Sequence, residues 1–317
     1  MAKKIVFDLS DGRVIADCFN LFNETKTMAD KRVENVAKKL LLVQQTAPQS
    51  PSIIGPDTAK LFQYNLKKPQ KHDLVYVLGN GSKYNNLEIK ISITSMLKFC
   101  SHWIGNIYIV GENSGINNPK VSHISSPDIT KTNKDANIIH KLLVAINKIP
   151  SLTENFLFCS DDILVTKKSD WEDFVPRILF EYKQNEQARR MLYNESRNNE
   201  WDKLLLGTLD RFIGCRDHIY FYEPHIFAPI NKRYFKQMCK QIDYTNSRNV
   251  IIMSLWFNWL NLKDPPKRFD HMSVFSSTIP NLNNVDRHLT YNDKAFDVKW
   301  FRDWLINRVT MEQFKTQ

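Results

Sequence analysis

The sequence has few glycines, scattered cysteines and no long apolar run. Nine glycines in 317 residues argue against a protein built from many tight turns. The five cysteines are odd in number and form no C-x-x-C pair, which argues against a disulfide framework or a zinc ribbon. No stretch approaches the roughly 18 apolar residues that a transmembrane helix needs. The N-terminus, MAKKIVFDLSDG, lacks the apolar segment of a secretory signal. We therefore expect a cytoplasmic protein whose thiols are buried and reduced. If a bacteriophage encodes the protein, we expect it in the cytoplasm of the host cell.

The charge balance of the chain is basic. Lysine and arginine number 44 against 34 acidic residues, a formal net charge of +10. A basic surface favours polyanionic partners such as nucleic acid, an anionic membrane face or a phosphorylated substrate. Net charge alone is weak evidence about binding partners, and a role in solubility explains the basic charge about equally well. Hydrophobic residues make up 42% of the chain, enough for a sizeable core.

The apolar pattern predicts an α/β fold in which helices flank a mainly parallel sheet. Residues 1–56 indicate a small N-terminal module with two short strands around an Asp-Gly turn, an amphipathic helix and a proline-rich loop. Residues 73–175 alternate buried strands with helices, which favours a parallel sheet covered on both faces. Residues 176–218 indicate a helical insertion, and residues 219–317 indicate a C-terminal part that completes the candidate site.

Two adjacent carboxylates follow the fourth predicted strand. The segment NFLFCSDDILV places Asp161 and Asp162 directly after apolar residues. Ligands of open parallel sheets bind beyond the carboxyl ends of the strands. A carboxylate pair there can hold Mg²⁺ or Mn²⁺, which neutralises a diphosphate leaving group. A solvated acidic turn or a salt-bridged pair explains the same two residues. Asn80, Gly81 and Ser82 follow the first strand and are expected at the same edge of the sheet.

Several cations and one histidine are further candidates. His225 follows a proline in an aromatic stretch, and a divalent ion held by acidic groups often recruits a distant histidine. Basic side chains can clamp a phosphate, although an ordinary solvated surface explains each cation about equally well. The further candidates for binding a phosphorylated cofactor or substrate are Lys90, Lys134, Asn137, Lys232 and Arg248.

The sequence leaves the catalytic base open. Asp293, Glu223 and Asp135 are the candidates, in that order.

Residues 73–173 resemble the Stealth-type family of sugar-phosphate transferases, relatives of nucleotide-sugar glycosyltransferases. The similar segments are DLVYVLGNGS, NNLEIKISITSMLKF, WIGNIYIVG and IPSLTENFLFCSDDILV, followed by EPHIFAPINKRYF, SLWFNWLNL and HLTYNDKAF. The resemblance implies a glycosyltransferase-A-like fold, a nucleotide-sugar donor (we expect a UDP-sugar) and a divalent metal at Asp161 and Asp162. It also implies that Asn80, Gly81 and Ser82 lie near the nucleotide, and that His225 and the Asn292–Asp293 pair approach the donor phosphates or sugar.

The chain departs from this family in two motifs. Gly79 and Asn80 stand where many members carry an aspartate, and Lys90 and Thr94 stand in place of two arginines. Losing an arginine removes a planar, two-point grip on a phosphate. We therefore favour simple glycosyl transfer over the sugar-1-phosphate transfer of the family.

The acceptor is the most open question. Basic and aromatic residues interleave in ARRMLYNESRNNEW and NKRYFKQMCK, which fits a surface that follows phosphates and stacks bases. We favour hydroxymethylated or already glycosylated bases of DNA, flipped from the duplex, by analogy with bacteriophage enzymes. The alternatives are Stealth-type transfer of a sugar 1-phosphate to a capsule or cell-surface polysaccharide, a non-catalytic nucleic-acid-binding protein, and a metal nuclease. A nuclease would need more converging carboxylates than the sequence shows.

Overall fold

The computed structural model describes residues 5–7, 14–16, 71–79, 82–182, 193, 199–213, 215–222, 225–245, 250–262, 271–283 and 285–309. The chain divides into two units, Met1–Ser52 and Ile53–Gln317. In the first unit, β1 (Ile5–Phe7) pairs antiparallel with β2 (Val14–Ala16), as predicted. The helix and loop predicted for residues 26–56 lie outside the described residues, and the four domain ranges stay predictions.

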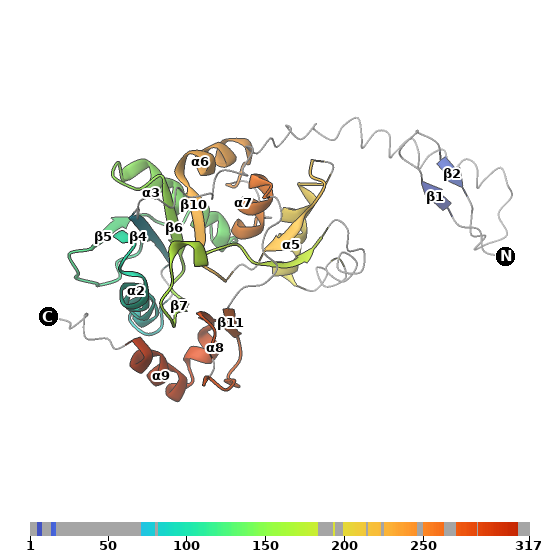
Figure 1. Cartoon of the computed structure of the whole chain (residues 1–317). Helices are drawn as coiled ribbons and strands as arrows, with labels where there is room; N and C mark the ends of the chain where they lie inside the picture. Colours follow the sequence, from blue (N-terminus) through green and yellow to red (C-terminus); the bar gives the residue numbers. More distant parts are fainter. Residues whose placement is uncertain are drawn as a thin grey trace. The chain divides into compact units, whose positions relative to one another are not determined.

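A five-stranded, mainly parallel sheet organises the second unit (Figure 1). Its order is β10-β6-β3-β4-β5, and β6, β3, β4 and β5 pair in parallel. Strand β10 joins β6 in antiparallel orientation at the edge. The predicted α/β class and all four parallel strands are therefore confirmed, with an additional antiparallel edge. The bounds are β3 (His72–Leu78), β4 (Ile104–Gly111), β5 (Val121–Ser125), β6 (Asn155–Cys159) and β10 (Ala228–Asn231).

Helices cover both faces of this sheet because its inner strands β6 and β3 are apolar on both sides. In β3, Leu74 and Tyr76 belong to the hydrophobic cluster of α2, whereas Val75 belongs to that of α3. Figure 1 shows α2 on one side of the sheet and α3, α6 and α7 on the other. Alternate residues of a strand point to opposite faces, so a continuous apolar run is buried on both. The helices are α2 (Leu87–Cys100), α3 (Lys134–Lys148), α5 (Glu200–Asp210), α6 (Lys232–Gln241) and α7 (Ile252–Leu260).

A second, smaller sheet continues directly from the first. Strand β7 (Ile163–Val165) begins one residue after Asp162 and pairs antiparallel with β12 (His288–Tyr291). Strand β11 (His271–Val274) lies parallel to β12 on its other side. Two helices follow, α8 (Asp293–Phe296) and α9 (Lys299–Val309), and their apolar residues share a core with the small sheet. The carboxylate pair therefore lies at the junction of the two sheets.

The segment expected to be helical begins with a strand. Residues 178–181 form β8 (Ile178–Glu181), which pairs antiparallel with β9 (Tyr220–Tyr222). This pairing joins residues about forty positions apart. The polar composition of the segment between them gave no signal for a strand pair. Within the described part of the insertion, α5 is helical as predicted. A short 3₁₀ helix, η2 (Trp171–Asp173), precedes β8. None of the described helices has both the length and the apolar character to cross a membrane.

Candidate functional site

Asp161 and Asp162 form the turn between β6 and β7, at the carboxyl edge of the parallel strands. Both residues are half-buried, and the Oδ1 atom of Asp162 is fully buried without a hydrogen-bond partner among the described residues. Burial, followed by the adjacent Asp162 carboxylate, raises the pKa of Asp161 to about 7. Burial also raises the pKa of Asp162. A buried, unpartnered carboxylate oxygen costs free energy unless a proton or a cation compensates it.

The backbone of this turn is anchored independently of its carboxylates. The Tyr291 amide donates to the carbonyl of Asp162 at 3.1 Å, and Thr290 Oγ1 donates to the same carbonyl at 3.2 Å. From α2, Ser92 Oγ donates to the carbonyl of Ile163. These bonds hold the turn between the two sheets through its backbone.

Two further acidic residues lie within electrostatic range of the carboxylate pair. Asp293, the first residue of α8, and Glu88, in the first turn of α2, each raise the pKa of Asp161 by their charge, after burial and Asp162. Ser82 Oγ donates to Glu88 Oε2 at 3.0 Å. The structure therefore brings Ser82 and Asp293, both predicted site residues, to the same edge as the carboxylate pair. Glu88 was not singled out in the sequence.

Tyr291 is a second residue that sequence reasoning missed. It is 1% exposed, and its hydroxyl is buried without a hydrogen-bond partner among the described residues. Burial raises its pKa, and the charges of Asp162, Glu88 and Asp161 raise it further. The phenol therefore lies within the field of these three carboxylates. Its position directly before the Asn292–Asp293 pair was the signal available in the sequence.

His225 lies at the same edge, before β10. Ala228 pairs with Phe158, so the residues that precede Ala228 run past the carboxyl end of β6. The charge of His225 opposes the burial-driven rise in the pKa of Asp162, which places the two side chains in electrostatic range. The His225 ring also lies 4.9 Å from that of Phe275, whose side chain is 42% exposed. No group of three or more His, Cys, Asp or Glu in the described part of the chain is arranged to hold a metal ion, and His225 as a ligand stays a prediction.

The structure places Lys232 away from this edge. Asn231 pairs with Asn155 at the start of β6, and Lys232 Nζ donates to the carbonyl of Leu152 at 2.8 Å. Six residues of chain separate Asn155 from Asp161, roughly 20 Å for an extended strand. Lys232 and the carboxylate pair therefore lie at opposite ends of β6, and the prediction that Lys232 binds the same donor is not supported by this geometry.

The remaining donor-binding candidates differ in exposure and in the hydrogen bonds that their side chains already make within the fold. The amide of Asn137 accepts from the backbone N–H groups of Ile129 and Thr130, both at 3.0 Å, and donates to the Thr130 carbonyl at 2.8 Å. Asn137 therefore shapes its own loop. Lys134 is exposed in the first turn of α3, and Lys90 is half-buried in α2. Their roles stay predictions, and Asn80, Gly81, Glu223 and Arg248 lie outside the described residues.

A buried lysine holds the end of β3. Lys141 is 2% exposed, and its Nζ donates to the carbonyl of Leu78 at 2.9 Å and to Asp128 Oδ1 at 2.6 Å. Leu78 is the last residue of β3 and precedes the predicted nucleotide loop. The sequence did not predict this role for Lys141, because a lysine in an amphipathic helix such as α3 resembles an ordinary surface residue.

Asp135 links the starts of α3 and α7. Its Oδ2 accepts from the Ile252 amide at 2.8 Å, and burial raises its pKa to about 6. The pKa of this carboxyl is lower in the unfolded state. The folded state therefore keeps the carboxyl protonated over a range of pH in which the unfolded state has lost the proton. The stability contributed by the protonated form is therefore complete below about pH 4 and lost as the pH rises through about 6.

We expect Asp135→Asn to stabilise the protein at pH 7.5 by up to about 3 kcal/mol, because the amide keeps an acceptor oxygen and removes the buried charge. Urea unfolding at pH 4 and 7.5 measures the difference, which should vanish at the lower pH. Asp303→Asn, which breaks an exposed ion pair with Lys299, is the matched control and should change stability by less than about 0.5 kcal/mol. Equal gains for Asp135→Asn at both pH values would contradict the expectation.

Several solved structures are similar to this chain at low sequence identity, among them the following three. An active-site mutant of LgtC has a TM-score of 0.41 at 12% identity, covering 74% of this chain and 95% of that one. The galactosyltransferase LgtC with donor and acceptor sugar analogues has a TM-score of 0.40 at 10% identity, covering 77% and 97%. Mouse xyloside xylosyltransferase 1 has a TM-score of 0.34 at 10% identity, covering 71% and 98%. No protein-family model and no curated protein matches the chain. Function therefore rests on the residues of the site.

Proposed function

We propose that the chain is a metal-dependent glycosyltransferase that moves a sugar from a nucleotide-sugar donor to an acceptor. The observation that carries the proposal is the half-buried carboxylate pair at the carboxyl edge of the parallel strands. A solvated acidic turn would leave both groups exposed with ordinary pKa values, whereas burial raises the pKa of both. In the described part of the chain, neither carboxylate forms a salt bridge that would make the pair purely structural.

The residues present fit a divalent cation. Mg²⁺ is commonly bound by one or two carboxylates together with substrate phosphates, so a site without a third protein ligand suits it. Asp161 and Asp162 would hold the ion, and the buried Oδ1 of Asp162 has no hydrogen-bond partner among the described residues. When bound, Mn²⁺ or Mg²⁺ supplies charge neutralisation at the leaving diphosphate.

Other residues have definable roles around the pair. Ser82 lies beside Glu88 at the start of α2, where the nucleotide of the donor is expected. Phe275 offers an exposed ring next to His225, on which a base or a sugar ring can stack. Asp293 is exposed and close enough to influence both carboxylates, so it suits a general base that accepts a proton from the acceptor hydroxyl.

The surroundings of α2 favour glycosyl transfer over sugar-1-phosphate transfer. Thr94 is 2% exposed, and its hydroxyl donates to the carbonyl of Lys90 at 2.6 Å. It therefore cannot replace an arginine as a phosphate ligand. For the acceptor we favour modified bases of DNA in the cytoplasm, supported by the net charge of +10 and the scattered cysteines. Nucleic-acid binding without catalysis would leave the half-buried carboxylate pair unexplained.

A thermal-shift screen tests the donor half of this proposal. We expect a UDP-sugar with Mn²⁺ to raise the melting temperature by roughly 5 °C at saturating concentrations, and each component alone to give less. ADP-, GDP- and CMP-sugars at the same concentration are the controls for nucleotide preference. A shift with bare DNA and none with any nucleotide sugar would favour the non-catalytic alternative.

A mass-spectrometric assay tests the acceptor half. Hydroxymethylated DNA and a polysaccharide are offered side by side with the donor found in the screen, and a sugar added to the DNA supports the proposal. The affinity for DNA should fall steeply with salt, because neutralising phosphates releases counterions. A flat dependence on salt would remove the polyanion interpretation while leaving the transferase proposal standing.

A further inference from the structure

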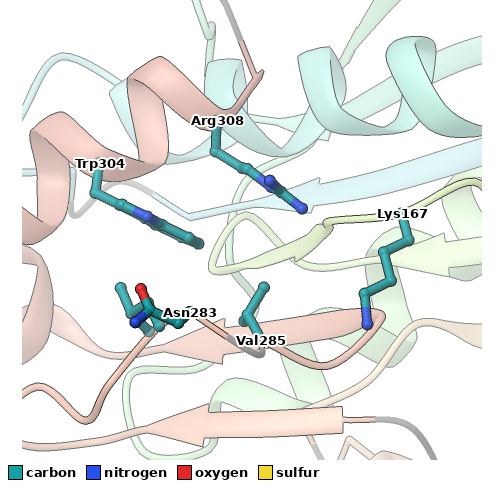
Figure 2. A pocket seen from close by; sticks show the side chains of 6 residues that line it. Lys167, Asn283, Val285, Trp304 and Arg308 are labelled. Carbon is teal, nitrogen blue, oxygen red and sulfur yellow. The ribbon is translucent and has the colours of Figure 1, made fainter.

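A pocket of about 390 Å³ lies between α9, the loop that precedes β12 and the segment that follows β7. Its lining residues are Lys167, Leu282, Asn283, Val285, Trp304 and Arg308. Figure 2 shows Trp304 and Arg308 projecting from one side, Asn283 and Val285 on the facing loop, and Lys167 at one end. Binding pockets for small ligands are typically about 300–1,000 Å³. The pocket is therefore large enough for a small ring with one charged substituent.

The pocket combines two cations with one aromatic ring. Arg308 Nη2 donates to the carbonyl of Thr166 at 3.1 Å, which orients the guanidinium and leaves other N–H groups free to donate. Lys167 is exposed and carries its charge to the same cavity (Figure 2). No carboxylate is among the described residues that line it, so these charges are not neutralised within the pocket. Such an arrangement attracts an anion, and a phosphate is a good match for an arginine.

The neutral walls indicate what the anion is attached to. The indole of Trp304 provides an apolar face, against which the C–H face of a sugar ring can pack. Asn283 is exposed on the opposite wall, where its amide can donate to and accept from hydroxyl groups. A ring with one apolar face, several hydroxyls and a phosphate satisfies all three parts of the lining.

The pocket is separate from the carboxylate pair. Lys167 follows Asp162 by five residues and lies beyond the other end of β7. Five residues of extended strand span roughly 16 Å. A ligand in this pocket therefore does not compete with a metal or diphosphate at Asp161 and Asp162.

We propose that this pocket is a second binding site, specific for a phosphorylated monosaccharide unit, in which Lys167 and Arg308 bind the phosphate and Trp304 packs against the sugar ring. Occupation of the pocket requires neither metal nor nucleotide sugar, so it goes beyond the proposed transferase function. Either proposal can fail while the other stands.

Calorimetric titration tests this site with glucose 6-phosphate, glucose and inorganic phosphate as probes. The wild-type protein should bind glucose 6-phosphate saturably and more tightly than either fragment. Lys167→Glu should weaken this binding about tenfold, since it reverses one of the two phosphate-binding charges. Lys168→Glu is the matched control: Lys168 is also exposed and adjacent in sequence, but it does not line the pocket. It should change affinity by less than about twofold.

A second variant separates the sugar from the phosphate. Trp304→Ala should weaken glucose 6-phosphate by about tenfold and leave inorganic phosphate unchanged, because it removes only the ring contact. Thermal melting of each variant checks that it is folded, and Lys167→Glu keeps the test valid if Trp304→Ala is not. Equal effects of Lys167→Glu and Lys168→Glu, or binding of a single-stranded oligonucleotide without binding of glucose 6-phosphate, would overturn the proposal.

Discussion

Asp162→Asn is expected to lower the rate of sugar transfer about a thousandfold at saturating Mn²⁺. Stabilisation of a leaving diphosphate by a metal contributes several kcal/mol, and about 4 kcal/mol corresponds to a factor of a thousand. The amide keeps the shape of the carboxyl group but removes the negative charge that attracts the ion. The measurement is the initial rate with the donor found in the thermal-shift screen, over a series of Mn²⁺ concentrations.

The fold should survive this substitution. The turn is held through the backbone carbonyl of Asp162 and through Ser92, neither of which the side chain changes. Because burial raises the pKa of Asp162, the metal-free protein loses stability as the pH rises through that pKa. Asp162→Asn should therefore melt at or above the temperature of the metal-free wild-type protein at neutral pH.

Asp293→Asn is the matched control for the role of the metal. It removes a nearby carboxylate that is exposed and proposed as the base, so it should reduce turnover but retain the melting shift caused by Mn²⁺ and donor. Asp162→Asn should lose both. Wild-type activity in Asp162→Asn would show that the metal role of this residue is wrong.

The sequence identified the parallel core because its signals are local. Strands β3, β4 and β6 are short apolar runs, and the alternation of strands with helices marks parallel pairing. The small sheet has no comparable signal, since Leu164 pairs with Leu289 across more than a hundred residues. A three-residue strand such as β7 is too short for periodicity to reveal, and only tertiary pairing defines it.

The candidate site follows the same division between local and long-range signals. Two charges directly after an apolar strand identify Asp161 and Asp162, whereas Glu88 and Tyr291 join them only through the fold. Lys232 illustrates the limit of sequence proximity. Its segment is near the site in sequence, but β10 runs antiparallel to β6, so residues after β10 lie at the amino edge and His225, before it, at the carboxyl edge. Motif order carries no information about strand direction.

Gly111→Ala is expected to destabilise the second unit by roughly 3–5 kcal/mol, among the largest effects of any single substitution. Gly111 ends β4 with φ of 135°, a conformation that favours glycine. A Cβ atom there would lie 1.9 Å from the carbonyl oxygen of Leu78 and 2.9 Å from its carbon, both backbone atoms. The adjacent strand must therefore move. Urea unfolding measures the loss.

The same substitution should also impair the donor site. The Leu78 oxygen that it displaces accepts from the buried Lys141, and the predicted nucleotide loop begins two residues later, at Asn80. We therefore expect the folded fraction of Gly111→Ala to lose the melting shift caused by the donor. Gly115→Ala is the control, because Gly115 also has positive φ (67°) but no atom within 4 Å of the added Cβ, and it should cost about 1 kcal/mol. Equal losses in the two variants would mean that backbone conformation alone, and not the close approach of β4 to β3, requires a glycine at position 111.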